Sequence, residues 1–285
     1  MAVVNTNLAA SIAQAALMRN ERALGTAMEQ LSTGKKINSA ADNASGLAIS
    51  TRMTSQIRGL DQAVRNANDA ISMVNTAEGA LDEITAMLQR MRELAVQSGT
   101  GTTASEDRSY LNQEYAHLLE EIQRVAVNTQ WNGRNILDGA AAGSGASSNV
   151  AFQVGMDPTQ VISVTFGNMG SAATMASLRG FNLSTPTATS AVQAASQVIV
   201  AADVAIEAVS TQRATFGAVS NRLTHTIDNL TNVITQSEAS RSRIMDTDYA
   251  QSTSELARTQ IIQQAGTAML AQANQLPQTV LALLQ

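Results

Sequence analysis

The sequence predicts a mainly α-helical protein: an elongated antiparallel helical bundle or coiled coil with a small β-hairpin tip and paired N- and C-terminal helices. Two stretches, 47–96 and 192–234, place apolar residues at alternating steps of three and four, the heptad spacing of helices that pack side by side. Hydrophobic residues make up 44% of the chain but aromatic residues only 3%, which favours close helix packing over a pocketed globular core.

The stretch 192–234 carries the longest repeat. At about 1.5 Å per residue it would form a rod of roughly 60 Å, which needs an equally long partner. Only Arg213 and Ser220 interrupt the seam, and we interpret them as marks of registry or as contacts between subunits. We expect Ser190 to cap this helix. The seam consists of Val192, Ala195, Ile199, Ala202, Ile206, Val209, Phe216, Leu223, Ile227, Leu230 and Ile234.

Residues 4–31 predict one amphipathic helix with a polar break at 19–22. Such a helix is marginal alone in water, so we expect it to order against another element. Residues 32–46 are small and polar and predict a connector that caps the next helix through Asp42 or Asn43. The Gly34-Lys35-Lys36 run lacks the spacing and the preceding strand of a phosphate-binding loop.

The second rod, 47–96, is followed by a glycine-containing link and a third helix. The pattern Thr103-Ala-Ser-Glu106 predicts a capping box, and the short link makes the third helix antiparallel to the rod. Residues 128–139 are rich in turn formers, and 140–148 predict a flexible link. Between 150 and 166 the apolar period changes to two, which predicts a β-hairpin, and 168–189 is expected to be irregular.

The last amphipathic helix is expected to pair with the first, with a possible kink at Pro277. The two ends of the chain would then belong to one domain and its middle to another. Residues 1–44 and 245–285 would form a terminal coiled-coil domain, and residues 45–244 would form a helical bundle whose β-rich tip covers about 138–189.

Composition excludes several classes of function. A net charge of −5 gives no basic field for nucleic acid. The chain has no cysteine, which excludes disulfides and thiolate metal sites. No unbroken run of about 18 apolar residues occurs, so we expect no membrane span. The N-terminus does not have the pattern of a cleavable signal peptide, and no cofactor is expected.

Five motifs resemble bacterial flagellin, and together they cover both ends of the chain. They are LSTGKKINSAADNASGLAISTRM (31–53), QRMRELAVQS (89–98), NTQWNGRNIL (128–137), SNRLTHTIDNL (220–230) and DTDYAQSTSELARTQIIQQAGTAMLAQANQ (246–275). Because only residues 138–189 stand where larger members insert outer domains, the chain resembles a minimal form without them.

The resemblance implies a subunit that polymerises into the flagellar filament for swimming motility. It also implies extracellular location and unfolded export through the flagellar type III apparatus, without signal cleavage. The implied partners are further subunits, hook-associated and cap proteins and a flagellar export chaperone. Polymerisation would use apolar residues of both terminal helices: Val4, Leu8, Ile12, Leu24, Met28, Leu31, Leu256, Ile261, Met269, Leu276, Val280 and Leu283.

The family also implies recognition by the innate immune Toll-like flagellin receptor. The matching residues are Arg90, Leu94 and Glu114. Arg90 and Leu94 share one helical face, which is compatible with a surface patch. The alternative interpretation of this face is an ordinary contact between subunits.

Other functions remain open at this stage. A hook–filament junction protein shares the terminal helices, and a cell-surface binding protein or adhesin could use the same scaffold. An enzyme is disfavoured, because His117 and His225 fall on separate helices and no nucleophile, base and orienting group cluster. Asp246 and Asp248 are expected to cap a helix rather than to form a carboxylate pair.

Overall fold

The computed structural model describes residues 7–139, 141, 149–170, 173–180, 182–183 and 188–283. The protein is mainly α-helical, as the sequence predicts. It divides into two compact units, Met1–Ile57 with Thr235–Gln285, and Arg58–Ile234. The border between the units falls inside two long helices, whereas the predicted border lay at the connectors near 44 and 245.

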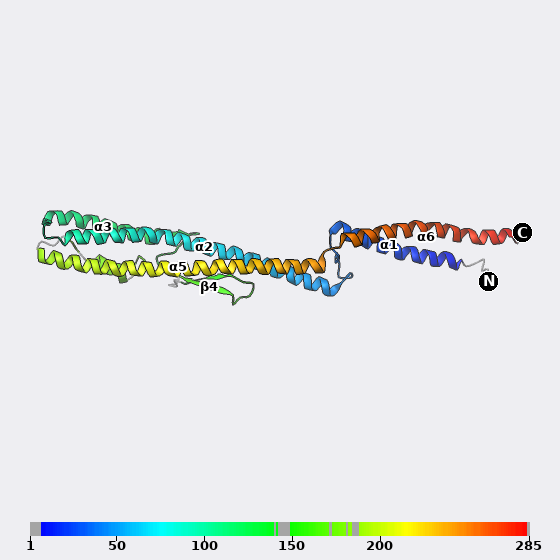
Figure 1. The fold of residues 1–285 in the computed structure, drawn as a ribbon, viewed down its shortest axis with the longest axis horizontal. Helices are drawn as coiled ribbons and strands as arrows, with labels where there is room; N and C mark the ends of the chain where they lie inside the picture. The colour runs from blue at the N-terminus through cyan, green and yellow to red at the C-terminus, as the bar shows by residue number, and fades with distance from the viewer. Residues whose placement is uncertain are drawn as a thin grey trace. The chain divides into compact units, whose positions relative to one another are not determined.

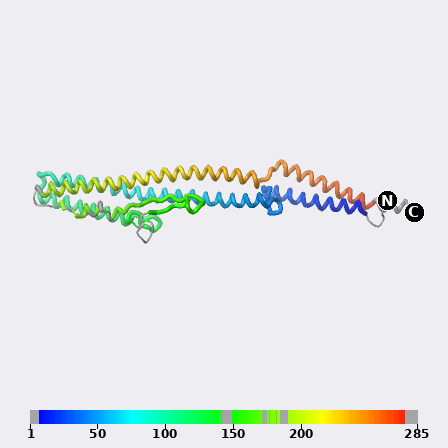
Figure 2. Tube along the Cα trace, turned by 90° about the horizontal axis from the view of Figure 1, so that it is seen from below, coloured from blue at the N-terminus to red at the C-terminus, as the bar shows by residue number. Residues whose placement is uncertain are grey.

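The terminal unit contains α1 (Leu8–Thr33) and α6 (Tyr249–Leu283), which run side by side (Figures 1 and 2). Their pairing confirms the predicted partnership of the terminal helices. The prediction of one helix over this stretch is confirmed, and the polar residues at 19–22 lie inside it. Arg19 and Arg22 donate from Nε to carbonyl oxygens one turn earlier. The helix α6 likewise continues through Pro277.

Two connectors meet beside this pair. Gly34 adopts a left-handed conformation with φ 69° and ends α1. Lys36 N donates to Met245 O at 2.7 Å, and Thr247 N donates to Gly34 O at 3.0 Å. The backbone of Lys35 also forms a β-bridge with that of Asp246. The segment after α1 is therefore fixed to the segment before α6 by main-chain hydrogen bonds.

Capping residues begin the helices that follow these connectors. Asn43 Oδ1 accepts from Gly46 N at 2.9 Å at the start of α2, as predicted. Asp248 Oδ1 accepts from Ala250 N at 2.9 Å and from Gln251 N at 3.2 Å, which confirms its capping role at α6. Backbone donors of Ser39 and Asn38 lower the pKa of Asp42.

The helices α2 (Ala44–Ser98) and α5 (Ala188–Met245) contribute their residues 58–98 and 188–234 to the second unit. Together with α3 (Ser105–Asn128) they lie alongside one another there (Figures 1 and 2). The predicted seams of α2 and α5 are buried or half-buried here, apart from Val192, which is exposed. Val192 lies in the first turns of α5. Ala191 and Ala195, not Val192, face the core there.

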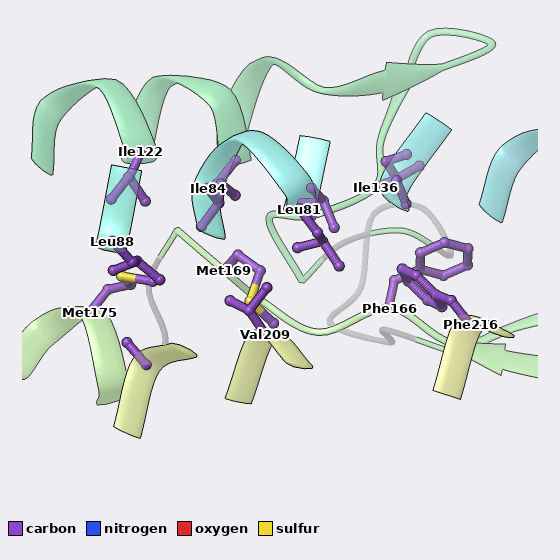
Figure 3. Close-up of a cluster of buried hydrophobic side chains, with 14 of the residues drawn as sticks. Leu81, Ile84, Leu88, Ile122, Ile136, Phe166, Met169, Met175, Val209 and Phe216 are labelled. Carbon is purple, nitrogen blue, oxygen red and sulfur yellow. The ribbon is translucent and has the colours of Figure 1, made fainter. Parts of the chain in front are cut away.

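Most buried residues of this unit belong to one large cluster, and Leu60, Ala63 and Leu230 form a second, smaller one. Figure 3 shows Leu81, Ile84 and Leu88 of α2 pointing into a cluster to which α3, α4, α5 and the segments next to the strands contribute. The rings of Phe166 and Phe216 lie 5.2 Å apart, centroid to centroid. The other labelled members are Ile122, Ile136, Met169, Met175 and Val209.

Arg213 interrupts the α5 seam because it pairs with acidic residues of α2. Its guanidinium lies 3.0 Å from Asp82 Oδ1 and 3.7 Å from Glu78 Oε1. Glu78 is a half-buried residue of α2, so the polar position of the α5 seam faces a polar position of α2. The guanidinium of Arg213 thus has two carboxylate partners at the edge of the core.

Two short strand pairs complete the second unit. The predicted hairpin is present as β3 (Asn149–Gln153) and β4 (Val161–Thr165), antiparallel, with Val150 opposite Val164. A smaller pair, β1 (Gln130–Trp131) and β2 (Arg134–Asn135), encloses Asn132 and Gly133 at φ 48° and 75°. Positive φ at both positions is the geometry of a type I′ hairpin turn.

Three local predictions were wrong. The helix α4 (Ala173–Arg179) lies in a segment expected to be irregular. The capping box at 103–106 does not form, because α3 begins after Ala104 without a side-chain cap. Ser190 lies inside α5 instead of capping it. Short capping and turn patterns are weak signals, because packing against the rest of the fold can override them.

The helix α5 also qualifies the expectation that no stretch could span a membrane. One 18-residue window of it has a mean hydropathy of 1.4 and is 28% buried, so by length and composition alone it could cross a membrane. The expectation counted unbroken apolar runs instead of averages. The helix contributes Val209 and Phe216 to the core, and its Asp203 accepts from Arg92 at 2.7 Å. A core helix passes the same test, so the window is weak evidence for a membrane.

A buried tyrosine makes the stability of the second unit fall at alkaline pH. Tyr115 donates from its hydroxyl to Leu178 O at 2.9 Å, and burial raises its pKa above the ordinary value of 10.0. The folded state therefore favours the neutral phenol, while the unfolded chain ionises near pH 10. The contribution of the buried phenol to the free energy of unfolding is complete below about pH 10 and is lost as pH rises through the folded-state pKa.

We therefore expect Tyr115→Phe to make the free energy of unfolding less sensitive to pH between about 9 and 11. Urea unfolding followed by far-UV circular dichroism measures this. The exposed Tyr110→Phe is the matched control and should keep the parental pH dependence. An equal alkaline slope in the parent and Tyr115→Phe would contradict the assignment.

Candidate functional site

The surfaces of α1 and α6 divide into an inner seam and an outward face. On α6 the inner positions follow a strict heptad, and four of them, seven residues apart, are small: Ser252, Thr259, Gly266 and Ala273. Between them lie Leu256, Gln263 and Leu270, which are half-buried. The seam of α6 is therefore made of small and polar residues as much as of leucines.

The inner positions of α1 show the same heptad. Asn20 and Ala27 are buried, and the half-buried positions are Ala10, Ala13, Leu17, Leu24 and Leu31. Asn20 Nδ2 donates to Thr259 O at 2.8 Å, and Asn7 Nδ2 donates to Ala273 O at 2.7 Å. These two hydrogen bonds define an antiparallel alignment of the pair.

Larger apolar side chains of both helices point away from this seam. We call them the outward apolar set: Leu8, Ile12, Met18, Met28, Ile261, Ile262 and Met269, which are between 43% and 67% exposed. Scattered exposed apolar residues are ordinary, but seven large ones on one helix pair are typical of a surface that contacts another protein.

The predicted polymerisation residues therefore separate into three groups. Leu24, Leu31 and Leu256 lie in the inner seam, and Leu8, Ile12, Met28, Ile261 and Met269 lie outward. Val4 and the side chains of Leu276, Val280 and Leu283 fall outside the described part of the chain. The sequence prediction treated the large residues as one seam. It missed the inner seam because small residues carry little weight in an apolar pattern, although the seven-residue spacing of 252, 259, 266 and 273 was visible.

The three residues of the predicted receptor patch lie in the second unit, but they do not form one surface. Arg90 donates from Nε to Glu114 Oε1 at 2.8 Å and from Nη1 to Glu93 Oε2 at 3.1 Å. The bond to Glu114, followed by that to Glu93, raises the pKa of Arg90. Leu94 is 0% exposed, so it packs in the core and does not share an exposed face with Arg90.

The Lys35-Lys36 run does not form a phosphate site. Lys36 and Arg243 line a groove of about 560 Å³ beside the two connectors of the terminal unit. Asp246, Asp248 and Glu255 line the same groove, and three carboxylates oppose an anionic ligand. Across the described ranges, no three His, Asp or Glu side chains gather as a metal site requires.

Two family models match most of the chain. The family model of the bacterial flagellin N-terminal helical region matches residues 4–142. The family model of the bacterial flagellin C-terminal helical region matches residues 199–284. The two matches include all of the inner seam, the outward apolar set and the Arg90–Glu114 pair.

Whole-chain relatives agree with the family models. The chain is 44% identical to a flagellin of Halalkalibacterium halodurans over 283 residues, covering 99% of this chain and 100% of that protein. It is 42% identical to a flagellin of Bacillus subtilis, covering 99% of each. A flagellar filament 33 kDa core protein of Treponema phagedenis is 40% identical, with 99% of this chain and 100% of that protein covered.

Among solved structures, the crystal structure of Bacillus cereus flagellin is similar to this chain. It shares 31% sequence identity and covers 58% of this chain and 88% of its own, with a TM-score of 0.49.

The burial of Leu94 gives a direct test of its role. Leu94→Ala should lower the free energy of unfolding by about 2–5 kcal/mol, because it removes a buried side chain and leaves a cavity. Val96→Ala on the same helix is the control, since Val96 is 51% exposed and should change stability little. Urea denaturation followed by circular dichroism measures both. Equal stability of the two variants would show that Leu94 is not a core residue.

Proposed function

The chain belongs to the bacterial flagellin family, and from this premise we propose that it is a structural subunit that polymerises into the flagellar filament for swimming motility. Flagellins are structural proteins and not enzymes. The observation that carries the proposal is the outward apolar set, which remains exposed after α1 and α6 have paired. Contacts between different surfaces of identical subunits extend without limit when the rotation does not close, and they then produce helical filaments.

The proposal includes the route and the partners of the subunit. We propose export in an unfolded state through the flagellar type III apparatus, without signal cleavage. An export chaperone would cover the terminal helices beforehand, and hook-associated and cap proteins would contact the ends of the filament. Unfolded export is supported by the absence of cysteine, since no disulfide has to be reduced or formed.

Assembly provides the first test of this proposal. The double variant Ile12→Ser with Ile261→Ser removes two exposed isoleucines, 59% and 66% exposed, without touching the inner seam. Burying each isoleucine contributes about 1.5–3 kcal/mol, so subunit association should weaken by about tenfold or more per residue. Sedimentation of seeded protein measures the loss, and electron microscopy shows the assemblies.

The control for this test is Gln14→Ser with Gln260→Ser, which changes exposed polar residues on the same helices. The control and the parent should form long helical filaments. Only short caps or discrete oligomers from the parent would favour a hook–filament junction protein or a surface binding protein on the same scaffold. Normal filaments from the isoleucine variant would show that the outward apolar set does not drive assembly.

We propose recognition by the innate immune Toll-like flagellin receptor as a second function. Arg90 and Glu114 lie on adjacent helices and are about half-exposed as an ion pair, which suits a surface read by charge and shape. Leu94 acts only from beneath, by supporting the helix that carries Arg90.

Receptor signalling tests this second function. Arg90→Ala and Glu114→Ala should each raise the concentration for half-maximal activation of receptor-expressing cells by about tenfold, since charged anchors of this kind often dominate binding. Thermal unfolding should not change, because the pair is exposed. Arg124→Ala, which breaks the similar exposed pair with Glu121, is the matched control. Equal signalling by all three variants would contradict the proposed patch.

A further inference from the structure

The methionines of this chain fall into classes that differ sharply in exposure. The protein has twelve methionines and no cysteine, so every sulfur atom belongs to a thioether. Four methionines of the second unit are at most 7% exposed, and four others in the described chain are between 47% and 66% exposed. The buried four are Met73, Met91, Met169 and Met175, the exposed four are Met18, Met28, Met156 and Met269, and Met53, Met87 and Met245 are half-buried.

Three of the four exposed methionines belong to the outward apolar set. Met18 and Met28 lie on α1, at 55% and 57% exposed, and Met269 lies on α6, at 66% exposed. We call them the three outward methionines. Met156 is different, because it lies in the turn between β3 and β4 of the second unit. Exposed sulfur is therefore concentrated on the two helices whose apolar surface is proposed to contact further copies of the chain.

A thioether reacts with a hydroperoxide by a two-electron transfer of oxygen. The sulfur lone pair attacks one peroxide oxygen, the O–O bond breaks and an S–O bond forms. The proton of the transferred oxygen goes to the leaving hydroxide, so hydrogen peroxide is reduced to water and the thioether is oxidised to a sulfoxide. This reaction converts an apolar, flexible side chain into a polar one, and reductases specific for each sulfoxide epimer reverse it.

The accessibility of the three outward methionines does not depend on how α1 and α6 are paired. Their side chains point away from the inner seam, so they are exposed while the helices are paired, and separation of the helices would expose them further. The buried methionines differ, because an oxidant reaches them only when the second unit opens. Oxidation of the exposed sulfurs ahead of the buried ones is therefore expected in the folded chain.

We propose that the three outward methionines are oxidation sites through which hydroperoxides reversibly switch off the association of free subunits. A sulfoxide oxygen is a hydrogen-bond acceptor, and covering it with an apolar neighbour removes its water without a replacement. Oxidation thus opposes contact at the same surface where apolar burial favours it. The effect on association rests on the proposed function, whereas the selectivity of oxidation is a property of one chain.

Mass spectrometry tests the selectivity after brief treatment of the full-length subunit with dilute hydrogen peroxide. Each sulfoxide adds one oxygen atom to the peptide that carries it. We expect the three outward methionines to be oxidised at least about tenfold faster than Met91 and Met175. Met156 is exposed and should react about as fast as the outward three. Equal rates at exposed and buried methionines would contradict the assignment of the sites.

The triple variant Met18→Leu, Met28→Leu and Met269→Leu tests the effect on assembly. Leucine keeps the apolar bulk and has no sulfur, and such a swap changes packing little. After peroxide treatment the parent should need at least about tenfold more protein for seeded assembly than before treatment. The triple variant should assemble alike before and after treatment. Met156→Leu keeps the three outward methionines, so it is the matched control and should lose assembly as the parent does.

Reduction separates sulfoxide formation from irreversible damage. The treated parent should recover its assembly after incubation with the two epimer-specific methionine sulfoxide reductases. The switch is wrong if the treated parent assembles like the untreated one, or if the triple variant loses assembly as much as the parent. Failure of the untreated parent to form filaments would overturn the proposed function and the switch with it, while the oxidation rates would still decide where the sites lie.

Discussion

The close approach of α1 and α6 constrains much of the terminal unit. Two helices whose backbones come this near must place small residues at their contact line, and α6 does so at every seventh residue. Leucines fill the positions between these small residues, while other large apolar residues, such as Ile12, Ile261 and Met269, remain outside the pair. The pairing of the terminal segments and the exposure of an apolar surface are therefore two results of one geometric requirement.

The helices of the second unit pack through larger residues. Its helices are separated by side chains such as Leu81, Leu88 and Phe216, which are fully buried and fill a continuous core. Ion pairs lie at the edges of this core, where Arg213 meets Asp82 and Arg92 meets Asp203. These pairs are partly exposed and contribute little to stability, but charges that match in only one alignment disfavour the others.

The sequence predicted the helices of both units and the β3–β4 hairpin because periodicity over many residues is a strong signal. The seam from Ala195 to Ile234 was found for that reason, and even its interruption at Arg213 was visible. The inner face of α6 was not identified from the sequence, because Ile261 and Met269 outweigh Gly266 and Ala273 in an apolar pattern. The expectation that Leu94 is exposed beside Arg90 was wrong for a related reason. Residues four apart lie on the same side of a helix, but one of them can be exposed while the other is buried under a neighbouring helix. Neither error can be corrected without knowing which helix lies opposite.

The composition of the terminal seam also bears on how folding and assembly are connected. A pair of helices whose seam mixes half-buried leucines with small residues and a buried amide gains less from apolar burial than the core of the second unit does. An isolated helix in water is marginal, and a pair with a thin seam inherits part of that weakness. Under the proposed function, contacts from neighbouring copies would cover the outward apolar set and stabilise the paired state by mass action. A stronger seam built from the large residues would fold the termini in the single chain, but it would bury the surface through which the next copy attaches.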